Sequence, residues 1–509
     1  MEENTKRVLK NACYLYIRQF VMMALSFIST RIVLEKLGVN DYGIYNVVGG
    51  FVALFTILNN VLQSATRRYL ALAIGKKDDD IIRKTFSTSI VMHLIIATVV
   101  VVALETVGVW MLNHTLNIAA DRMYAANWVL QFSIFTVFIS ITQTPYTAIV
   151  TAHERFNVYA VMSIYDVCAK IGILFLLIYI PLDKLIVYAA LMCVVSFTSC
   201  MLYRYYCMRQ FPECRRLKLR VSRPLMIEML KFSGWDSFGN ITTIVNAEGI
   251  TLMLNIFFST VVNAARGLAT AVTATIENFV SGFVQAAEPQ LVKYYGQGDK
   301  DRFERLVFNV SQMTLFMLAI MAVPVWLEME YVLKLWLGTV PEYTASFIKI
   351  TIFICFITYS NIMLLKANVA IGRVREISLY MAPTAIIHLP LVYLVLKLGW
   401  NPVAVYWVGA IPSTMRLFID LYILHKFTEF PVMKYFMGVF LKNIFIVAIA
   451  ALIPFFVQKT MTEGAVRFIA VGTVSVMSTL TFMWFLGLNR DVKAMVMARV
   501  KNRFSRKNI

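Results

Sequence analysis

Long apolar runs are the feature that most constrains this chain, because they recur from one end of it to the other. Hydrophobic residues make up 59% of its 509 positions and charged residues only 15%. Soluble domains carry about 25% charged residues. A helix needs roughly 20 mostly apolar residues to cross the hydrocarbon core of a bilayer. The sequence therefore predicts an all-α polytopic membrane protein.

About 14 runs are long enough to be transmembrane helices. They lie near residues 12–34, 44–66, 86–112, 124–150, 156–180, 184–206, 236–258, 263–288, 306–328, 345–366, 376–397, 402–424, 436–457 and 466–488. The first run is too long for a cleaved signal peptide and is interrupted by Arg18 and Arg31, so we expect it to be a retained span.

Basic residues test this count, because the cytoplasmic loops of membrane proteins carry an excess of Lys and Arg. If the N-terminus is cytoplasmic, the inside segments hold roughly 30 basic residues and the outside segments about six. This contrast predicts cytoplasmic N- and C-termini. It also assigns the net charge of +19 to loops that face anionic membrane lipids, so no nucleic-acid partner is expected.

The two halves of the chain resemble each other at an offset of about 222 residues. Gln63 and Ala65 correspond to Gln285 and Ala287, and with a one-residue slip the segment GKKDDD (75–80) corresponds to GQGDKD (296–301). Six spans in each half predict two parallel-repeat lobes, with two further helices beyond them. The expected divisions are an N-lobe at 1–206, a basic cytoplasmic connector at 207–235, a C-lobe at 236–424, spans 13 and 14 within 425–488, and a basic tail at 489–509.

Neither metal nor nucleotide chemistry is indicated. The seven cysteines are scattered through apolar runs without zinc-like spacing, and we interpret them as small packing residues. No phosphate-binding Gly loop, nucleophile elbow or HExxH motif occurs. We therefore expect no metal, no cofactor and no catalytic residue, that is, a protein that is not an enzyme.

Four local strings carry a resemblance to a known family. They are LGVNDYGIYNVVGG (37–50), ATRRY (65–69), ETVGVW (105–110) and PYTAIVTAHERF (145–156). Together with the 6+6+2 arrangement, they resemble the polysaccharide exporters of the multidrug/oligosaccharidyl-lipid/polysaccharide (MOP) superfamily. The resemblance is strongest over residues 1–180 and is closest to O-antigen or lipopolysaccharide repeat-unit flippases of Bacteroides-type bacteria.

This resemblance implies a flippase of the bacterial inner membrane. Its substrate would be a polyprenyl-pyrophosphate-linked oligosaccharide, moved by alternating access, and coupling to H⁺ or Na⁺ would be the energy source. Glycosyltransferases and a polymerase of the same pathway would be its partners. A sugar–pyrophosphate headgroup cannot cross hydrocarbon unaided, because its polar groups would lose water without replacement.

Ionisable residues within the spans are candidate site residues, since each is costly unless it is paired or faces water. Arg18 and Arg31 lie in span 1. Thirteen residues separate them, which sets them roughly 220° apart around a straight helix, so both cannot face one cavity. Either could bind an anionic headgroup, and Arg18 could equally extend to the cytoplasmic surface.

Two pairs of opposite charge stand at i,i+4 spacing, which puts both members on one helix face. They are Asp166 with Lys170 in span 5, and Arg416 with Asp420 in span 12. Each pair could neutralise itself on a cavity-lining helix, or substrate phosphate or a coupling ion could compete for one partner. Both interpretations direct these faces toward the cavity and make the four residues substrate-binding candidates.

Glu248 in span 7 and Glu277 in span 8 have no cationic neighbour at i±3 or i±4. A buried lone carboxylate can carry a proton, so both are candidates for ion coupling, although a protonated carboxyl bonded between helices would look the same. Arg266, near the outer end of span 8, is a further substrate-binding candidate or a charge close to a loop. His93 in span 3 is expected to be a hydrogen-bonded packing residue.

Two other function classes remain open. A multidrug cation antiporter of the same fold would favour acidic cavities and 12 spans, whereas this chain has intramembrane arginines and about 14 spans. A membrane polysaccharide polymerase or ligase would be expected to carry a large outside loop. No long outside loop is predicted here.

Overall fold

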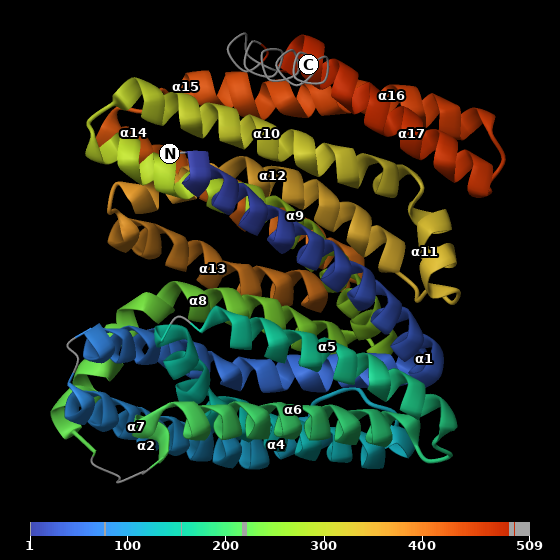
Figure 1. Ribbon diagram of the computed structural model, residues 1–509. Coiled ribbons are helices and arrows are strands. Elements are labelled where there is room, and N and C mark those ends of the chain that lie inside the picture. Colours follow the sequence, from blue (N-terminus) through green and yellow to red (C-terminus); the bar gives the residue numbers. More distant parts are fainter. Residues whose placement is uncertain (1, 76–77, 154, 216–220, 488–492, 494–509) are drawn as a thin grey trace, which may run out of the picture. The chain divides into compact units, whose positions relative to one another are not determined.

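The computed structural model describes residues 2–75, 78–153, 155–215, 221–487 and 493, and the side chains of residues 2–27 lie outside the described part. Every regular element in these ranges is a helix (Figure 1). Each predicted span lies within a helical segment, apart from at most about one residue at its end, and nine segments in the described ranges are long and apolar enough to cross a membrane. The prediction of an all-α polytopic fold is confirmed.

The first half of the chain begins with one long helix that holds both of its first two predicted spans. The elements are α1 (Glu2–Gly75), α2 (Asp79–Ala103), η1 (Leu104–Gly108), α3 (Val109–His114), η2 (Ala120–Arg122), α4 (Met123–Ala152), α5 (Phe156–Tyr179), α6 (Lys184–Gln210), α7 (Pro212–Arg215) and α8 (Arg223–Phe257). Within α1 the helix is broken at Gly38, whose φ of 79° suits a residue without a Cβ.

The second half repeats this order of long helices and adds a C-terminal pair. The elements are α9 (Thr260–Gly296), α10 (Lys300–Leu327), α11 (Met329–Leu337), α12 (Thr344–Ala370), α13 (Val374–Lys397), α14 (Pro402–Thr428), α15 (Val432–Tyr435), η3 (Phe436–Leu441), α16 (Lys442–Thr460), α17 (Ala465–Phe482) and η4 (Met483–Gly487).

The boundaries of corresponding helices reproduce the internal repeat seen in the sequence. α2 and α10 begin 221 residues apart, and α4 and α12 begin 221 residues apart as well. α1 and α9 end at Gly75 and Gly296, the glycines that the sequence comparison had aligned. Asp78 and Asp299, also aligned, each accept a hydrogen bond from a backbone N–H in the first turn of the next helix. The repeat therefore extends to the capping residues that start corresponding helices.

The chain divides into two compact units. The first contains Met1–Leu268 and Leu389–Pro402, and the second contains Ala269–His388 and Val403–Ile509. α8 belongs to the first unit because it packs against α1. This division follows packing, so the repeat-based limits at 1–206, 207–235, 236–424 and 425–488 stay predictions. The predicted tail 489–509 lies outside the described residues except for Lys493.

The first unit is organised around α1 and α4. α1 packs against α4 and α8, and α4 packs against α2 and α6. Arg122, at the start of α4, bonds the carboxylates of Asp41 at 2.5 Å and Asp183 at 2.6 Å, which ties the bend of α1 to the first turn of α6. Asp183 also caps α6. One guanidinium thus holds together the bend of α1 and the first turns of α4 and α6.

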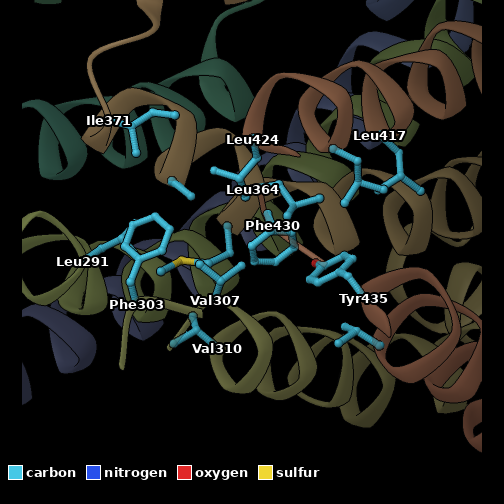
Figure 2. Close-up of a cluster of buried hydrophobic side chains, with 14 of the residues drawn as sticks. Leu291, Phe303, Val307, Val310, Leu364, Ile371, Leu417, Leu424, Phe430 and Tyr435 are labelled. Atoms are coloured by element: carbon cyan, nitrogen blue, oxygen red, sulfur yellow. The ribbon is translucent and has the colours of Figure 1, made fainter. Parts of the chain in front are cut away.

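The second unit is built on a core between α9, α10, α12 and α14 that is continued by α15 and η3. Figure 2 shows this cluster, in which Phe430 and Tyr435 lie side by side with ring centroids 5.8 Å apart. Its buried members are Val284, Leu291, Phe303, Val307, Val310, Met363, Leu364, Ala367, Ile371, Leu417, Leu421, Leu424, Phe430, Tyr435 and Val439. The Tyr435 hydroxyl donates to the carbonyl of Ser360 at 2.6 Å, so the ring is fixed by packing and by a hydrogen bond.

The C-terminal pair α16 and α17 is attached to α10 by polar contacts at both ends. Gln312 donates to Asn443 Oδ1 at 3.2 Å and to the carbonyl of Gly487 at 2.7 Å. Glu328, almost fully buried at the end of α10, accepts from Arg467 of α17 at 2.9 Å. These bonds fix the pair to the second unit.

Candidate functional site

Glycines bring the second limb of α1 unusually close to the hairpin formed by α8 and the start of α9. A Cβ added to Gly43 would overlap the backbone carbonyl of Thr260, and one added to Gly267 would lie 2.5 Å from Asn46 Oδ1. A Cβ on Gly50 would lie 2.5 Å from Glu248 Oε2. Gly43 meets backbone and therefore needs glycine, whereas at Gly50 and Gly267 the close atoms are the ends of the Glu248 and Asn46 side chains.

Polar side chains fill the line of contact between these helices. We call this surface the polar seam, and it comprises Gly43, Asn46, Gly50, Glu248, Thr251, Thr260, Asn263, Arg266 and Gly267, all in the first unit. Three of its members form one chain of bonds, in which Arg266 Nε donates to Thr251 Oγ1 at 2.8 Å and the Thr251 hydroxyl lies 3.4 Å from Glu248 Oε2. Nη2 of Arg266 donates to the carbonyl of Ala247 at 2.6 Å.

Arg266 and Glu248 are thereby brought together. The guanidinium acts electrostatically on the carboxylate, which is half-buried on α8. The sequence had assigned the two residues to separate roles, and it had treated Glu248 as a carboxylate without a cationic neighbour. That treatment was right for α8 alone, but the neighbour is supplied by the next helix.

A signal in the sequence could have found this pairing. Glu248 and Arg266 lie nine residues before and nine residues after Phe257, where α8 ends. Two antiparallel helices joined by a short turn bring positions at equal distance from the turn to the same level. Thr251 and Asn263 are equidistant from Phe257 too, and the Asn263 amide donates to the Thr251 carbonyl at 2.8 Å. Comparing the residues at equal distances before and after Phe257 would have revealed both contacts.

One end of the seam is bonded to the segment after α3. The backbone N–H of Asn117 donates to Asn255 Oδ1 at 2.8 Å, and the Asn117 amide donates to the carbonyl of Phe258. Thr260 donates to Asn40 Oδ1 at 3.4 Å. The α8–α9 turn is therefore held by side chains from the bend of α1 and from a separate loop.

The ion cluster around Arg122 belongs to the same unit and shows how burial and pairing oppose each other. Burial pushes the pKa of Asp183 upward, but the hydrogen bonds from Arg122 and from the backbone N–H groups of Ile186 and Leu185 outweigh it, so the pKa lies below its ordinary value. Asp41 is more deeply buried, and burial raises its pKa despite Arg122. These groups anchor helix ends, and we assign them a structural role.

The span 1 arginines are only partly described. The side chain of Arg18 lies outside the described residues. Arg31 is exposed on the first limb of α1, one turn before Glu35, whose carboxylate feels its charge. Their roles as phosphate-binding residues stay predictions.

The two predicted i,i+4 pairs behave differently. Lys170 and Asp166 on α5 form an ion pair at 3.9 Å, and both side chains are exposed by 40% or more, which leaves them open to another ligand. Among the residues the structure describes, Arg416 and Asp420 make no ion pair. Asp420 is fully buried and accepts from Asn361 at 2.6 Å and from Asn368 at 3.0 Å, both on α12.

The expected pairing in span 12 therefore needs correction. The spacing put Arg416 and Asp420 on one face of α14, but two amides of α12 lie closer to the carboxylate than the guanidinium does, and Arg416 acts on it only electrostatically. Asp420 is enclosed between α12 and α14. Its surroundings are those of a packed helix contact.

Glu277 and His93 complete the candidates. Glu277 is exposed on α9, near enough to Cys355 and Tyr359 of α12 for its charge to act on them. A mid-span carboxylate that protein does not cover must face water to remain charged, so its candidacy for ion coupling stays open. His93 is buried with Nδ1 2.8 Å from the carbonyl of Ser89, which confirms it as a packing residue.

The sequence did not predict the ion pair between Lys366 and Glu288. Lys366 of α12 lies 3.0 Å from Glu288 of α9, and both are about one-third exposed. They are 78 residues apart in the chain, so no periodicity on one helix could have related them.

The helical fold is that of MOP-superfamily membrane transporters. An inward-facing multidrug resistance MATE transporter of that superfamily aligns with a TM-score of 0.64 at 12% identity, over 81% of this chain and 95% of its own. The lipid II flippase MurJ aligns with a TM-score of 0.64 at 13% identity, over 92% of this chain and 98% of its own. A MOP-superfamily transporter from Pyrococcus furiosus aligns with a TM-score of 0.51 at 12% identity, over 81% and 96%.

Residues 8–295 match the family model of polysaccharide biosynthesis proteins, so the chain belongs to that family. The resemblance to MOP-superfamily polysaccharide exporters that the sequence predicted is confirmed. A search of curated protein sequences gives no match.

Proposed function

We propose that this protein is a flippase for a lipid-linked oligosaccharide. Its substrate would be a polyprenyl-pyrophosphate-linked repeat unit of O-antigen, capsule or lipopolysaccharide. The protein would move it from the cytoplasmic to the outer leaflet of the bacterial inner membrane by alternating access. Both termini would lie in the cytoplasm, as the distribution of basic residues predicts.

The observation that carries this proposal is the family match joined to the extent of the structural likeness. The matched family is described as polysaccharide biosynthesis proteins. MurJ, described as a lipid II flippase, aligns over 92% of this chain, whereas the MATE transporter aligns over 81%. The greater share favours a flippase over a drug exporter.

The chemistry of the proposed cargo fits residues of the first unit. A pyrophosphate needs cationic donors, and guanidinium groups bind phosphate oxygens with two parallel hydrogen bonds. Arg266 donates to the hydroxyl of Thr251 and to the carbonyl of Ala247, and it acts electrostatically on Glu248. We assign Arg266, with Arg18 and Arg31, to headgroup binding, and Glu248 and Glu277 to ion coupling.

The polar seam has a role in the transport cycle under this proposal. Its glycines let α1 lie in close contact with α8 and α9. In the proposed orientation the α8–α9 turn lies on the outer side, so the seam would close the outer end of the pathway. Substrate release would require it to open, which exposes Arg266 and Glu248 to the headgroup.

A multidrug cation antiporter is the second candidate, favoured by the equal TM-score of the MATE transporter. The two candidates differ in the charge of the cargo. Deleting the gene separates them, because loss of a flippase leaves lipid-linked repeat units on the cytoplasmic leaflet, while loss of an antiporter leaves surface polysaccharide unchanged and creates drug sensitivity.

The deletion is then complemented with the wild-type gene, Arg18→Ala and Arg266→Gln, with protein in the membrane quantified for each. We expect the wild type to restore surface polysaccharide and both variants to restore less of it at equal protein abundance. Full restoration by a variant removes that arginine from the site. Normal polysaccharide in the deletion strain overturns the flippase assignment.

A further inference from the structure

Arg204 of α6 is a half-buried cation that the predicted site does not include. It lies six residues before the end of α6 at Gln210, which is about 9 Å along the helix. Its neighbours Tyr203, Tyr205 and Tyr206 form a tyrosine cluster of the kind that marks the level of lipid headgroups. Tyr205 is 60% exposed, so protein leaves this side of the helix uncovered.

Only neutral groups hold the guanidinium in place. Its Nη2 donates to Thr142 Oγ1 of α4 at 2.9 Å, its plane lies 5.4 Å from the centroid of the Tyr146 ring, and the Cys200 thiol is beside it. Its Nε is buried and has no hydrogen-bond partner. Within the described ranges, no carboxylate lies within ion-pair distance of Arg204.

Two other partly buried arginines of the described residues are neutralised by acids. Arg122 bonds Asp41 and Asp183, and Arg467 bonds Glu328. Glu213, the acidic residue nearest the end of α6 in sequence, is bonded to His153 at 2.8 Å. Arginine cannot lose its proton, and a guanidinium withdrawn from water without a counter-ion is costly. Arg204 therefore keeps a positive charge that an anion would neutralise.

We propose that Arg204 and Thr142 form a binding site for the phosphate of an anionic lipid headgroup between α4 and α6. At this level of the membrane the abundant anions are lipid phosphates, which juxtamembrane basic residues attract. Arg209 and Arg215 lie on the same end of the helix, where they hydrogen-bond Tyr205 and backbone carbonyls and add positive potential. Arg204 supplies the donors that fix the phosphate at one point.

Two lipids could supply that phosphate, namely a resident phospholipid or an isoprenoid pyrophosphate. The site's position in the cytoplasmic leaflet rests on the orientation given under the proposed function. The binding of a phosphate by Arg204 does not depend on that orientation. It can therefore be tested separately, by a binding measurement that involves no transport.

The experiment uses the purified full-length protein and counts retained lipids by native mass spectrometry, together with the shift in unfolding temperature. Phosphatidylglycerol, polyprenyl pyrophosphate and zwitterionic phosphatidylethanolamine are added in turn. We expect Arg204→Gln to weaken binding of one of the two anionic lipids roughly five- to tenfold and to leave phosphatidylethanolamine unaffected. The lipid that loses affinity identifies the source of the phosphate.

Arg209→Gln is the matched control, because it removes an exposed arginine from the same helix end. Equal losses of lipid affinity in Arg204→Gln and Arg209→Gln would overturn the proposal, because they would show that diffuse surface charge attracts the lipid. Unchanged binding of both anionic lipids to Arg204→Gln would also overturn it. If Arg204→Gln does not fold, Thr142→Val keeps the charge and removes one fixing contact. A loss of about twofold with that variant supports the site, and no loss overturns it.

Discussion

Two intramembrane carboxylates, Glu248 of the first unit and Asp420 of the second, differ in their surroundings. Asp420 has no exposed surface and accepts hydrogen bonds from two amides of a single neighbouring helix. Glu248 is half-buried, faces Gly50 of α1, and has one hydroxyl at 3.4 Å and the charge of Arg266.

The difference separates a structural carboxylate from one that can change partners. A fully buried charge stabilises a helix contact only as long as every one of its donors remains in place. A carboxylate on a seam between helices, with a long hydrogen bond and a cationic neighbour on another helix, loses little when the seam opens. We therefore expect substitutions around Asp420 to reduce stability and substitutions around Glu248 to reduce transport.

Removing a donor from Asp420 should have the largest effect. Asn368→Leu leaves a buried carboxylate short of a donor, which costs about 3–5 kcal/mol in free energy of unfolding. Thr147→Val is the matched control, since it lies 221 residues earlier on α4, where its hydroxyl bonds a carbonyl of its own helix. Unfolding of both variants in detergent checks this, and equal stabilities would show that Asp420 does not depend on its amides.

Replacing the two carboxylates themselves gives the direct comparison. Asp420→Leu removes the carboxylate acceptor of both buried amides and leaves Asn368 only the backbone carbonyl of residue 420, so we expect a loss of about 1–3 kcal/mol. Glu248→Met leaves Arg266 with its other acceptors, and the loss should stay below about 1 kcal/mol while transport falls. Unfolding and transport are measured on the same preparations. A Glu248→Met protein that is less stable than Asp420→Leu would reverse the assignment.

The seam should also respond to a single methyl group. Gly43→Ala forces the α1 backbone away from the Thr260 carbonyl, which costs about 1–3 kcal/mol in the closed arrangement. Gly49→Ala, on the same helix, meets nothing within 4 Å and serves as control. We expect transport to fall in the first variant and not in the second. Equal transport by the two would mean that the close approach does not matter for the cycle.

The smallest effect should come from a carboxylate outside the spans. Burial tends to raise the pKa of Glu213, but its hydrogen bond with His153 outweighs this and holds the pKa below its ordinary value of 4.5. The pair thus contributes stability above about pH 4.5, and this is lost as the pH falls through the lowered pKa. The contribution is a few tenths to about 1 kcal/mol. Unfolding measured against pH should show the loss in the wild type and not in Glu213→Gln.

The sequence was sufficient for the architecture, because hydropathy and the distribution of charge are properties of single segments. The break at Gly38, the helix ends at Gly75 and Gly296, and the caps at Asp78 and Asp299 are likewise local, and the repeat aligned the last four of these residues.

The site was less predictable because its contacts are tertiary. The i,i+4 rule found the Asp166–Lys170 pair but failed for Asp420, where amides on another helix compete with Arg416. Glu248 acquired a cationic neighbour only through the α8–α9 hairpin. Arg204 has an ordinary position in the sequence, and its contacts with Thr142 and Tyr146 come from another helix.

Translocation itself is the most direct test of the account. The purified protein is reconstituted into liposomes that carry a polyprenyl-pyrophosphate-linked oligosaccharide, and a membrane-impermeant glycosidase reports how much of the sugar is accessible from outside. The account predicts that wild-type protein and Gly49→Ala bring lipid from the inner leaflet within reach of the enzyme, and that Gly43→Ala and Arg266→Gln do so more slowly. Accessibility equal to that of protein-free liposomes, with wild-type protein folded in the membrane, would contradict the proposed function.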